Sequence, residues 1–160
     1  MDYCILSAAP VGRYVLDLLG GARDGYETAD ALCIALQVIN HLQDCRNDYL
    51  TLNRVYIPTD WMEAAGAPIE SLSATATSAS LRTVFERTIC ATDRLLTRAN
   101  SLPGHLVSRR LAMESGAIIF IARQLIQFLK QQDPLENRIE LTKPRFLACC
   151  LTGSVWGYFQ

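Results

Sequence analysis

Four oxygen-bearing side chains recur at helical spacing between residues 32 and 50. They are Gln37, Asn40, Asp44 and Asp48, separated by three, four and four positions. At about 100° per residue, these four side chains fall within one narrow arc of a helix, while the apolar residues of the segment point elsewhere. We call these four residues the polar stripe.

A polar stripe on a helix is most often a solvated face, and two features argue against that interpretation here. Gln37 and Asn40 are neutral amides at positions where a solvated face usually carries Lys and Glu. Asp44 and Asp48 form a like-charge pair that costs roughly a few tenths of a kcal/mol unless a cation lies between them. A divalent cation would supply that compensation.

The ligand types indicate which cation would bind. Hard oxygen ligands without a His or Cys partner favour magnesium, which takes one or two carboxylates and completes its shell with water and substrate phosphate. The stripe therefore predicts a magnesium-bridged diphosphate. Arg54 and Tyr56 follow directly, and the fork of arginine suits phosphate oxygens, although a lone Arg is more often an ordinary surface residue.

The elements that must position these residues are all expected to be helices. Apolar residues recur at three and four positions, and the strict alternation of half-buried strands is nowhere sustained, which predicts an all-α protein. Because we find no repeat or linker, we expect residues 1–160 to form one domain, with 71–80 as a surface loop. The expected helices span 2–19, 28–50, 59–65, 80–100, 105–132 and 142–158, with His105 at a helix start.

The composition indicates which binding partners and which cellular compartment to expect. A net charge of -1 provides no basic surface for nucleic acid, so we expect no nucleic-acid partner. The six cysteines lack CxxC spacing and are expected to pack as free thiols in a reducing, cytoplasmic setting. The longest uncharged apolar run, 116–122, is far shorter than the roughly 20 residues that span a bilayer, so we expect no transmembrane segment.

Two segments resemble the squalene and phytoene synthase family of trans-isoprenyl diphosphate synthases. Residues 35–61, ALQVINHLQDCRNDYLTLNRVYIPTDW, resemble its second aspartate-rich motif and the following Arg-x-Tyr-x-Pro. Residues 2–13, with Asp-Tyr-Cys and Ser-Ala-Ala-Pro-Val-Gly-Arg, resemble the preceding helix. Gln43 before Asp44, and the segment around Arg109, are most similar to the hydroxysqualene synthases of bacterial hopanoid biosynthesis. The chain thus resembles the carboxy-terminal part of such an enzyme.

The resemblance implies roles for particular residues within an isoprenoid synthase-type helical bundle. It implies that Asp44 and Asp48 bind magnesium that holds the substrate diphosphate. The other implied roles are catalytic for Tyr3, Arg54 and Tyr56, and substrate-binding for Val11, Gly12, Gln37 and Asn40. Val11 and Gly12 would line the hydrocarbon channel.

The chain departs from the family pattern in two respects. Asn53 stands where most relatives have Gly before the arginine. The departure bears on the backbone conformation of the turn at this position. The chain also begins at the Tyr3 segment, so we expect it to lack the helices of the first aspartate-rich motif and to have little activity alone. Its expected partners are a missing amino-terminal half or a second copy, with peripheral membrane contact through exposed apolar surface.

For the complete enzyme, the resemblance implies ionisation of presqualene diphosphate and water capture of the carbocation as hydroxysqualene. Formation of presqualene diphosphate, squalene or phytoene is the nearest alternative. A non-catalytic helical interaction module, in which the aspartates are solvated, is the alternative from another class. A di-iron bundle is disfavoured because no Glu-x-x-His pair occurs.

Overall fold

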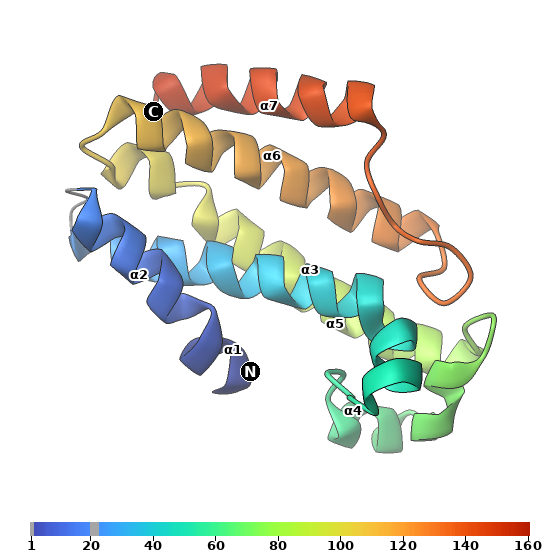
Figure 1. Ribbon diagram of the computed structural model, residues 1–160. Helices are drawn as coiled ribbons and strands as arrows, with labels where there is room; N and C mark the ends of the chain where they lie inside the picture. Colours follow the sequence, from blue (N-terminus) through green and yellow to red (C-terminus); the bar gives the residue numbers. More distant parts are fainter. Residues whose placement is uncertain (1, 20–22) are drawn as a thin grey trace.

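The computed structural model describes residues 2–19 and 23–160, and within these residues all regular structure is helical. This confirms the all-α prediction (Figure 1). The helices are α1 (Asp2–Ser7), α2 (Ala9–Leu18), α3 (Tyr26–Leu52), α4 (Thr59–Ala64), α5 (Ala79–Ala99), α6 (Arg109–Gln131) and α7 (Lys143–Tyr158). Short 3₁₀ turns occupy Arg23–Gly25, Ile69–Ser73 and Leu102–His105.

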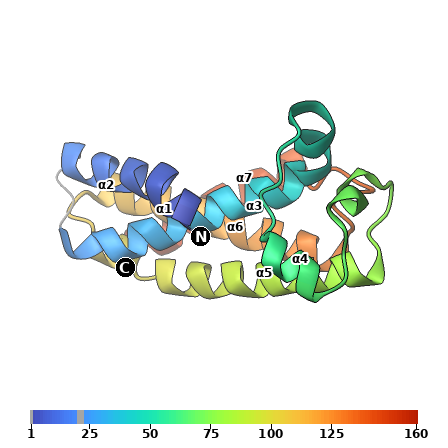
Figure 2. The same ribbon diagram turned by 90° about the horizontal axis from the view of Figure 1, so that it is seen from below.

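The helices are arranged around α3. This helix contacts α1 and α2 on one side and α5 and α6 on the other, while α7 packs on the outer side of α6 (Figures 1 and 2). Ala35, Ile39 and Leu42 on α3 are at most 1% exposed and belong to the main hydrophobic cluster. Burial of this apolar face fixes the direction in which the opposite, polar face of α3 points.

The expected helix over 2–19 is wrong in one respect, because the chain forms two helices there. α1 ends at Ser7, and α2 begins at Ala9 with Pro10 in its first turn. Proline has no N–H for the carbonyl four residues earlier and its ring crowds that carbonyl, but it is tolerated in a first turn. Gly20 and Gly21, where paired glycines predict the end of the first helix, lie outside the described residues.

Two other expected boundaries also differ from the structure. Leu102–His105 form a 3₁₀ turn, and α6 starts at Arg109, where Ser108 Oγ accepts a hydrogen bond from Leu111 N at 3.4 Å. His105 therefore precedes the helix instead of starting it. The expected surface loop over 71–80 is shorter, because Leu72 is fully buried in a 3₁₀ turn and α5 begins at Ala79.

Glycines allow α6 and α7 to approach each other closely. A Cβ atom added at Gly153 would lie 2.5 Å from the carbonyl oxygen of Gly116, and one added at Gly157 would lie 2.3 Å from that of Ala112. Gly153 and Gly157 are both buried, one turn apart on α7. Backbone therefore meets backbone along this seam, which only residues without a side chain permit.

α6 is the one helix in the described part of the chain that is long and apolar enough to cross a membrane by length and composition. That criterion is weak evidence, because a core helix of a soluble protein also meets it. Ile119 and Ile126 of α6 are fully buried within the bundle, and α7 covers its glycine seam. Because 33% of its apolar window is buried, α6 packs in the bundle by one face.

The seam predicts a specific stability change. Gly153→Ala should lower the free energy of unfolding by about 1–3 kcal/mol, because the added methyl group would force two backbones apart. Gly104→Ala is the matched control, since a Cβ atom there meets nothing within 4 Å. Urea unfolding followed by circular dichroism measures both variants. Equal stability of the two variants would contradict the close approach of α6 and α7.

Candidate functional site

The polar stripe lies on α3, on the face opposite its buried residues Ala35, Ile39 and Leu42. Gln37, Asp44 and Asp48 are half-buried, and Asn40 is exposed. Among the described residues, neither Asp44 nor Asp48 forms a salt bridge, although six other such pairs exist. Two carboxylates therefore lie one helical turn apart, and neither is in an ion pair with a described residue.

An aromatic cluster lies beside the stripe and joins three segments of the chain. The rings of His41 on α3 and Tyr56 after α3 are stacked, with centroids 3.9 Å apart and planes 6° apart. Tyr3 on α1 lies 6.0 Å from His41 and 6.3 Å from Tyr56, measured between ring centroids. Ser7 Oγ donates to Gln37 Oε1 at 3.1 Å, which attaches α1 to the stripe. Tyr3 and Tyr56, predicted as catalytic residues, are thus neighbours.

The turn after α3 returns Arg54 toward the same cluster. Asn53 has a φ of 50° and a ψ of 42°, the left-handed conformation that asparagine tolerates better than most residues. The N–H of Arg54 donates to the carbonyl of Asp48 at 3.2 Å, and Arg54 Nη1 donates to Tyr56 Oη at 3.4 Å. The departure at Asn53 is therefore compatible with a tight turn that keeps Arg54 close to Asp48.

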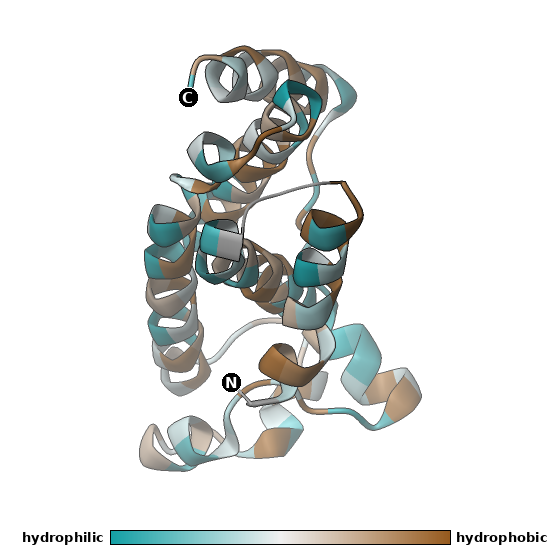
Figure 3. Cartoon of the chain, turned by 90° about the vertical axis from the view of Figure 1, so that its left-hand side faces the viewer, coloured by the Kyte–Doolittle hydropathy of each residue, from teal (hydrophilic) through white to brown (hydrophobic). Residues whose placement is uncertain are grey.

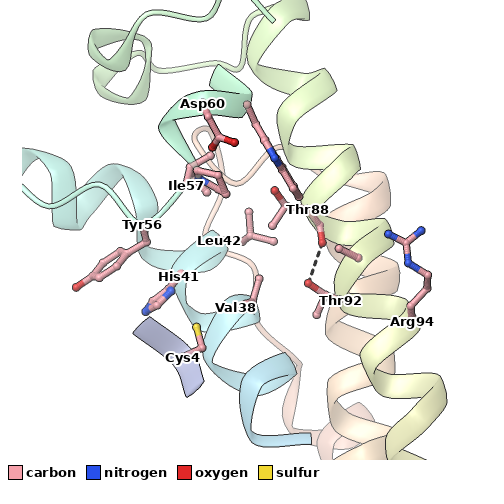
Figure 4. A pocket seen from close by; sticks show the side chains of 13 residues that line it. Cys4, Val38, His41, Leu42, Tyr56, Ile57, Asp60, Thr88, Thr92 and Arg94 are labelled. Atoms are coloured by element: carbon pink, nitrogen blue, oxygen red, sulfur yellow. Dashed lines mark hydrogen bonds between the residues drawn. The ribbon is translucent and has the colours of Figure 1, made fainter. Parts of the chain in front are cut away.

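A cavity of about 430 Å³ opens next to this cluster (Figure 4). His41 and Tyr56 form part of its wall, and Thr88 and Thr92 of α5 form another. Burial lowers the pKa of His41 below 6.5, while the nearby charges of Asp48 and Asp44 act in the opposite direction. Burial thus favours the uncharged form of this imidazole at the wall of the cavity.

The predicted channel residues lie at a different cavity, between α2, α3 and α6. Val11 and Gly12 line this space of about 230 Å³, together with Leu36 and Ile118 and other mainly apolar side chains. A Cβ atom at Gly12 would lie 2.7 Å from Cys33 Sγ, so glycine lets α2 approach α3. The structure thus places Val11 and Gly12 at an apolar surface suited to hydrocarbon, apart from the carboxylates.

A polar hollow on the Asp44 side contains residues that the sequence did not single out. Its volume is about 420 Å³, and Asn137 and Arg138 from the α6–α7 connection face Asp44 and Arg46 across it. Gln43 Nε2 donates to the carbonyl of Ile139, 96 positions away, which ties this connection to α3. No local spacing could reveal such a contact, because it depends on how α6 packs.

Known proteins with similar sequences identify the family to which this chain belongs. The chain belongs to the squalene and phytoene synthase family, whose sequence profile matches residues 1–145. It is 41% identical over its whole length to a hydroxysqualene synthase of Zymomonas mobilis, and 41% identical over 89% of its length to one of Sinorhizobium fredii. It spans 54% and 49% of those relatives, or about half of each.

Two solved structures share the fold. The squalene synthase HpnC from Alicyclobacillus acidocaldarius superposes with a TM-score of 0.75 at 30% identity, over 82% of this chain and 49% of that one. A dehydrosqualene synthase superposes with a TM-score of 0.85 at 21% identity, over 97% of this chain and 55% of that one. The likeness confirms a squalene synthase-like helical bundle and again covers about half of each neighbour.

The half-buried imidazole of His41 predicts a pH dependence of stability. Because burial lowers the pKa of His41, the unfolded chain binds more protons than the folded chain below pH 6.5. The free energy of unfolding should therefore fall as pH drops below about 6.5, and His41→Gln should flatten that fall. Urea unfolding at a series of pH values measures the slope. His105→Gln, at the other, exposed histidine, is the control and should keep it.

The prediction would be contradicted if the free energy of unfolding of His41→Gln kept the same slope with pH while that of His105→Gln lost it.

Proposed function

We propose that this chain provides the second aspartate-bearing half-site of a hydroxysqualene synthase-like enzyme that acts on presqualene diphosphate. The observation that carries the proposal is the unpaired, half-buried pair Asp44 and Asp48 beside Arg54 and Tyr56. This pair lies in a chain 41% identical to a hydroxysqualene synthase. The complete reaction also requires a first half-site, as in enzymes about twice this length.

The donor set fits magnesium as a half-site. Within the described residues no group of three or more His, Cys, Asp and Glu side chains could enclose a metal. Asp44 and Asp48 supply two carboxylates, and Asn40 presents an exposed amide one turn before Asp44. Magnesium needs no more from the protein when substrate phosphate and water complete its shell, and a bound ion would also relieve the repulsion between the carboxylates.

The reaction divides between polar and apolar parts of the site. Magnesium supplies charge neutralisation for the departing diphosphate. Arg54 binds diphosphate oxygens, and Tyr56 orients its guanidinium through the Nη1–Oη hydrogen bond. The carbon–oxygen bond breaks and its electron pair leaves with diphosphate, so the carbocation forms beside the Tyr3 and Tyr56 rings, whose faces favour positive charge.

The hydrocarbon then lies against apolar surface. Val11 and Gly12 line the cavity between α2, α3 and α6, which keeps water away from most of the carbocation. One water molecule adds its oxygen to the cation and loses a proton, giving hydroxysqualene. Gln37 and Asn40 form the polar wall between this hydrocarbon and the diphosphate. Presqualene diphosphate, squalene or phytoene is the alternative product, and product analysis distinguishes them.

The proposed setting is the cytoplasm, with peripheral contact at a membrane surface. A non-catalytic helical interaction module is the competing function, in which Asp44 and Asp48 are merely solvated. The two functions differ in what they require of these carboxylates. An interaction module needs no metal, whereas a diphosphate half-site binds its ligand only with a divalent cation.

Magnesium dependence therefore provides the direct test. Calorimetric titration with a non-hydrolysable isoprenyl diphosphate analogue should show binding with magnesium and none with excess chelator. Asp44→Asn/Asp48→Asn should abolish the magnesium-dependent part, because both anionic ligands are removed.

Glu63→Gln/Glu70→Gln is the charge-matched control, since both carboxylates are exposed, lie on elements other than α3, and form no ion pair within the described residues. Binding by the aspartate variant that equals binding by the glutamate variant would refute the half-site. Metal-independent binding would favour the interaction module.

A second prediction concerns turnover. The purified 160-residue chain should convert presqualene diphosphate far more slowly than full-length relatives, because a diphosphate clamped from one side ionises poorly. Supplying the amino-terminal half of a hydroxysqualene synthase should raise the rate and yield hydroxysqualene, detected by gas chromatography. Full activity of the chain alone would contradict the proposal.

A further inference from the structure

Tyr56 lies on a stretch of chain that no helix supports. Residues 53–58 connect α3 to α4 without regular secondary structure. Arg54 is exposed, and within the described residues the one hydrogen bond of its guanidinium runs from Nη1 to Tyr56 Oη, at 3.4 Å. The burial of Ile57 anchors the backbone beside Tyr56 but leaves its ring free to turn about the side-chain torsions. The direction of the guanidinium therefore depends on what holds the ring of Tyr56.

The ring of His41 packs face to face on the ring of Tyr56. The two ring centroids are 3.9 Å apart and the planes 6° apart, and Figure 4 shows both side chains at one edge of the cavity. His41 stands in the middle of α3, between Ile39 and Leu42, which are 1% and 0% exposed. The core therefore fixes the backbone of His41, and the stack holds a residue outside the helix at a defined position.

The other surroundings of Tyr56 hold its ring less closely. Tyr3 on α1 is 59% exposed, and its ring lies 6.3 Å from that of Tyr56 at an angle of 41°. The cavity of about 430 Å³ borders both His41 and Tyr56, so close packing is missing on that side. Stacked aromatic pairs contribute to stability beyond the area that they bury. The stack on His41 is thus the contact that sets the orientation of the Tyr56 ring.

We propose that His41 is a positioning residue for the diphosphate. Its ring fixes the ring of Tyr56, and the Tyr56 hydroxyl in turn orients the guanidinium of Arg54 beside Asp48. An arginine side chain that is oriented before binding loses less rotational freedom when it binds, so the affinity is higher. The inference rests on the proposed function, because it concerns the same half-site. It assigns the effect of His41 to the face of its ring and not to a proton that it gives or accepts.

His105 provides the matched control on another part of the molecule. It is exposed, and its Cβ lies 3.6 Å from the position of a Cβ atom added at Gly25, directly before α3. About 24 Å of helix separate that position from His41. The 3₁₀ turn of His105 contacts α6 and α7, whereas α1 and α3 carry Tyr3 and His41. Figure 3 places the C-terminus, where α7 ends, at the top of the molecule and the N-terminus, beside α1, in its lower half.

Calorimetric titration of the 160-residue chain with inorganic pyrophosphate in magnesium buffer tests the proposal. His41→Leu removes the ring and should weaken magnesium-dependent binding about threefold to tenfold, because the stack is lost. His41→Phe keeps a flat ring that can stack, so its affinity should stay within about twofold of that of the parent chain. His105→Leu should leave the affinity unchanged. Far-ultraviolet circular dichroism shows whether each variant is folded.

A double-mutant cycle with Tyr56→Phe provides the second test. This variant removes one hydroxyl group from a half-buried ring and keeps the ring itself. It should weaken binding by about the same factor as His41→Leu, because Arg54 loses its hydrogen-bond partner. Adding His41→Leu to Tyr56→Phe should then weaken binding no further, since the stack and the hydroxyl act through one guanidinium.

The outcomes distinguish the positioning role from its alternatives. Recovered affinity in His41→Phe, together with losses that do not add in the cycle, supports the proposal. Equal losses in His41→Leu and His41→Phe would overturn it, and so would full affinity in His41→Leu or additive losses with Tyr56→Phe. Failure of the proposed function gives a different result, because the parent chain would then bind pyrophosphate no better than Asp44→Asn/Asp48→Asn. That result would also overturn the inference, since His41 would have no diphosphate to position.

Discussion

Burial of one face of α3 is the interaction on which the rest of the structure depends. Ala35, Ile39 and Leu42 are withdrawn from water against the bundle, and their apolar burial sets the rotation of the whole helix. With that rotation fixed, Asp44 and Asp48 point to the opposite side without any contact that holds them there. The two carboxylates are therefore positioned by the core, and neither forms an ion pair within the described part of the chain.

The sequence predicted those parts of the molecule that depend on local chemistry. Spacing located the helices and the polar stripe, since periodicity is a property of neighbouring residues. It missed the division of the first helix before Pro10 and the late start of α6 at Arg109, where a proline in the first turn and the Ser108 side-chain cap set the helix boundary in place of apolar periodicity. The stack of His41 on Tyr56, and the position of Arg138 near Asp44, follow from tertiary packing and leave no signal in spacing.

The two ends of α3 have different surroundings. Asp48 and Arg54 lie where α3 ends and the chain turns back, beside polar and aromatic groups. Val11 and Gly12 lie where α2 crosses α3, beside apolar groups. α3 thus fixes the separation between a polar, charged region at its end and an apolar region where α2 crosses it, a geometry that loops could not hold as rigidly.

The unbroken course of α3 also limits how this part of the chain can change length in evolution. An inserted or deleted residue between Ile39 and Asp48 would rotate everything beyond it by about 100°. The carboxylates would turn toward the core while Leu42 or Cys45 turned toward water. Length changes should therefore accumulate in the connections around 100–108 and 132–142, where no periodic face has to be kept, and be absent from the middle of α3.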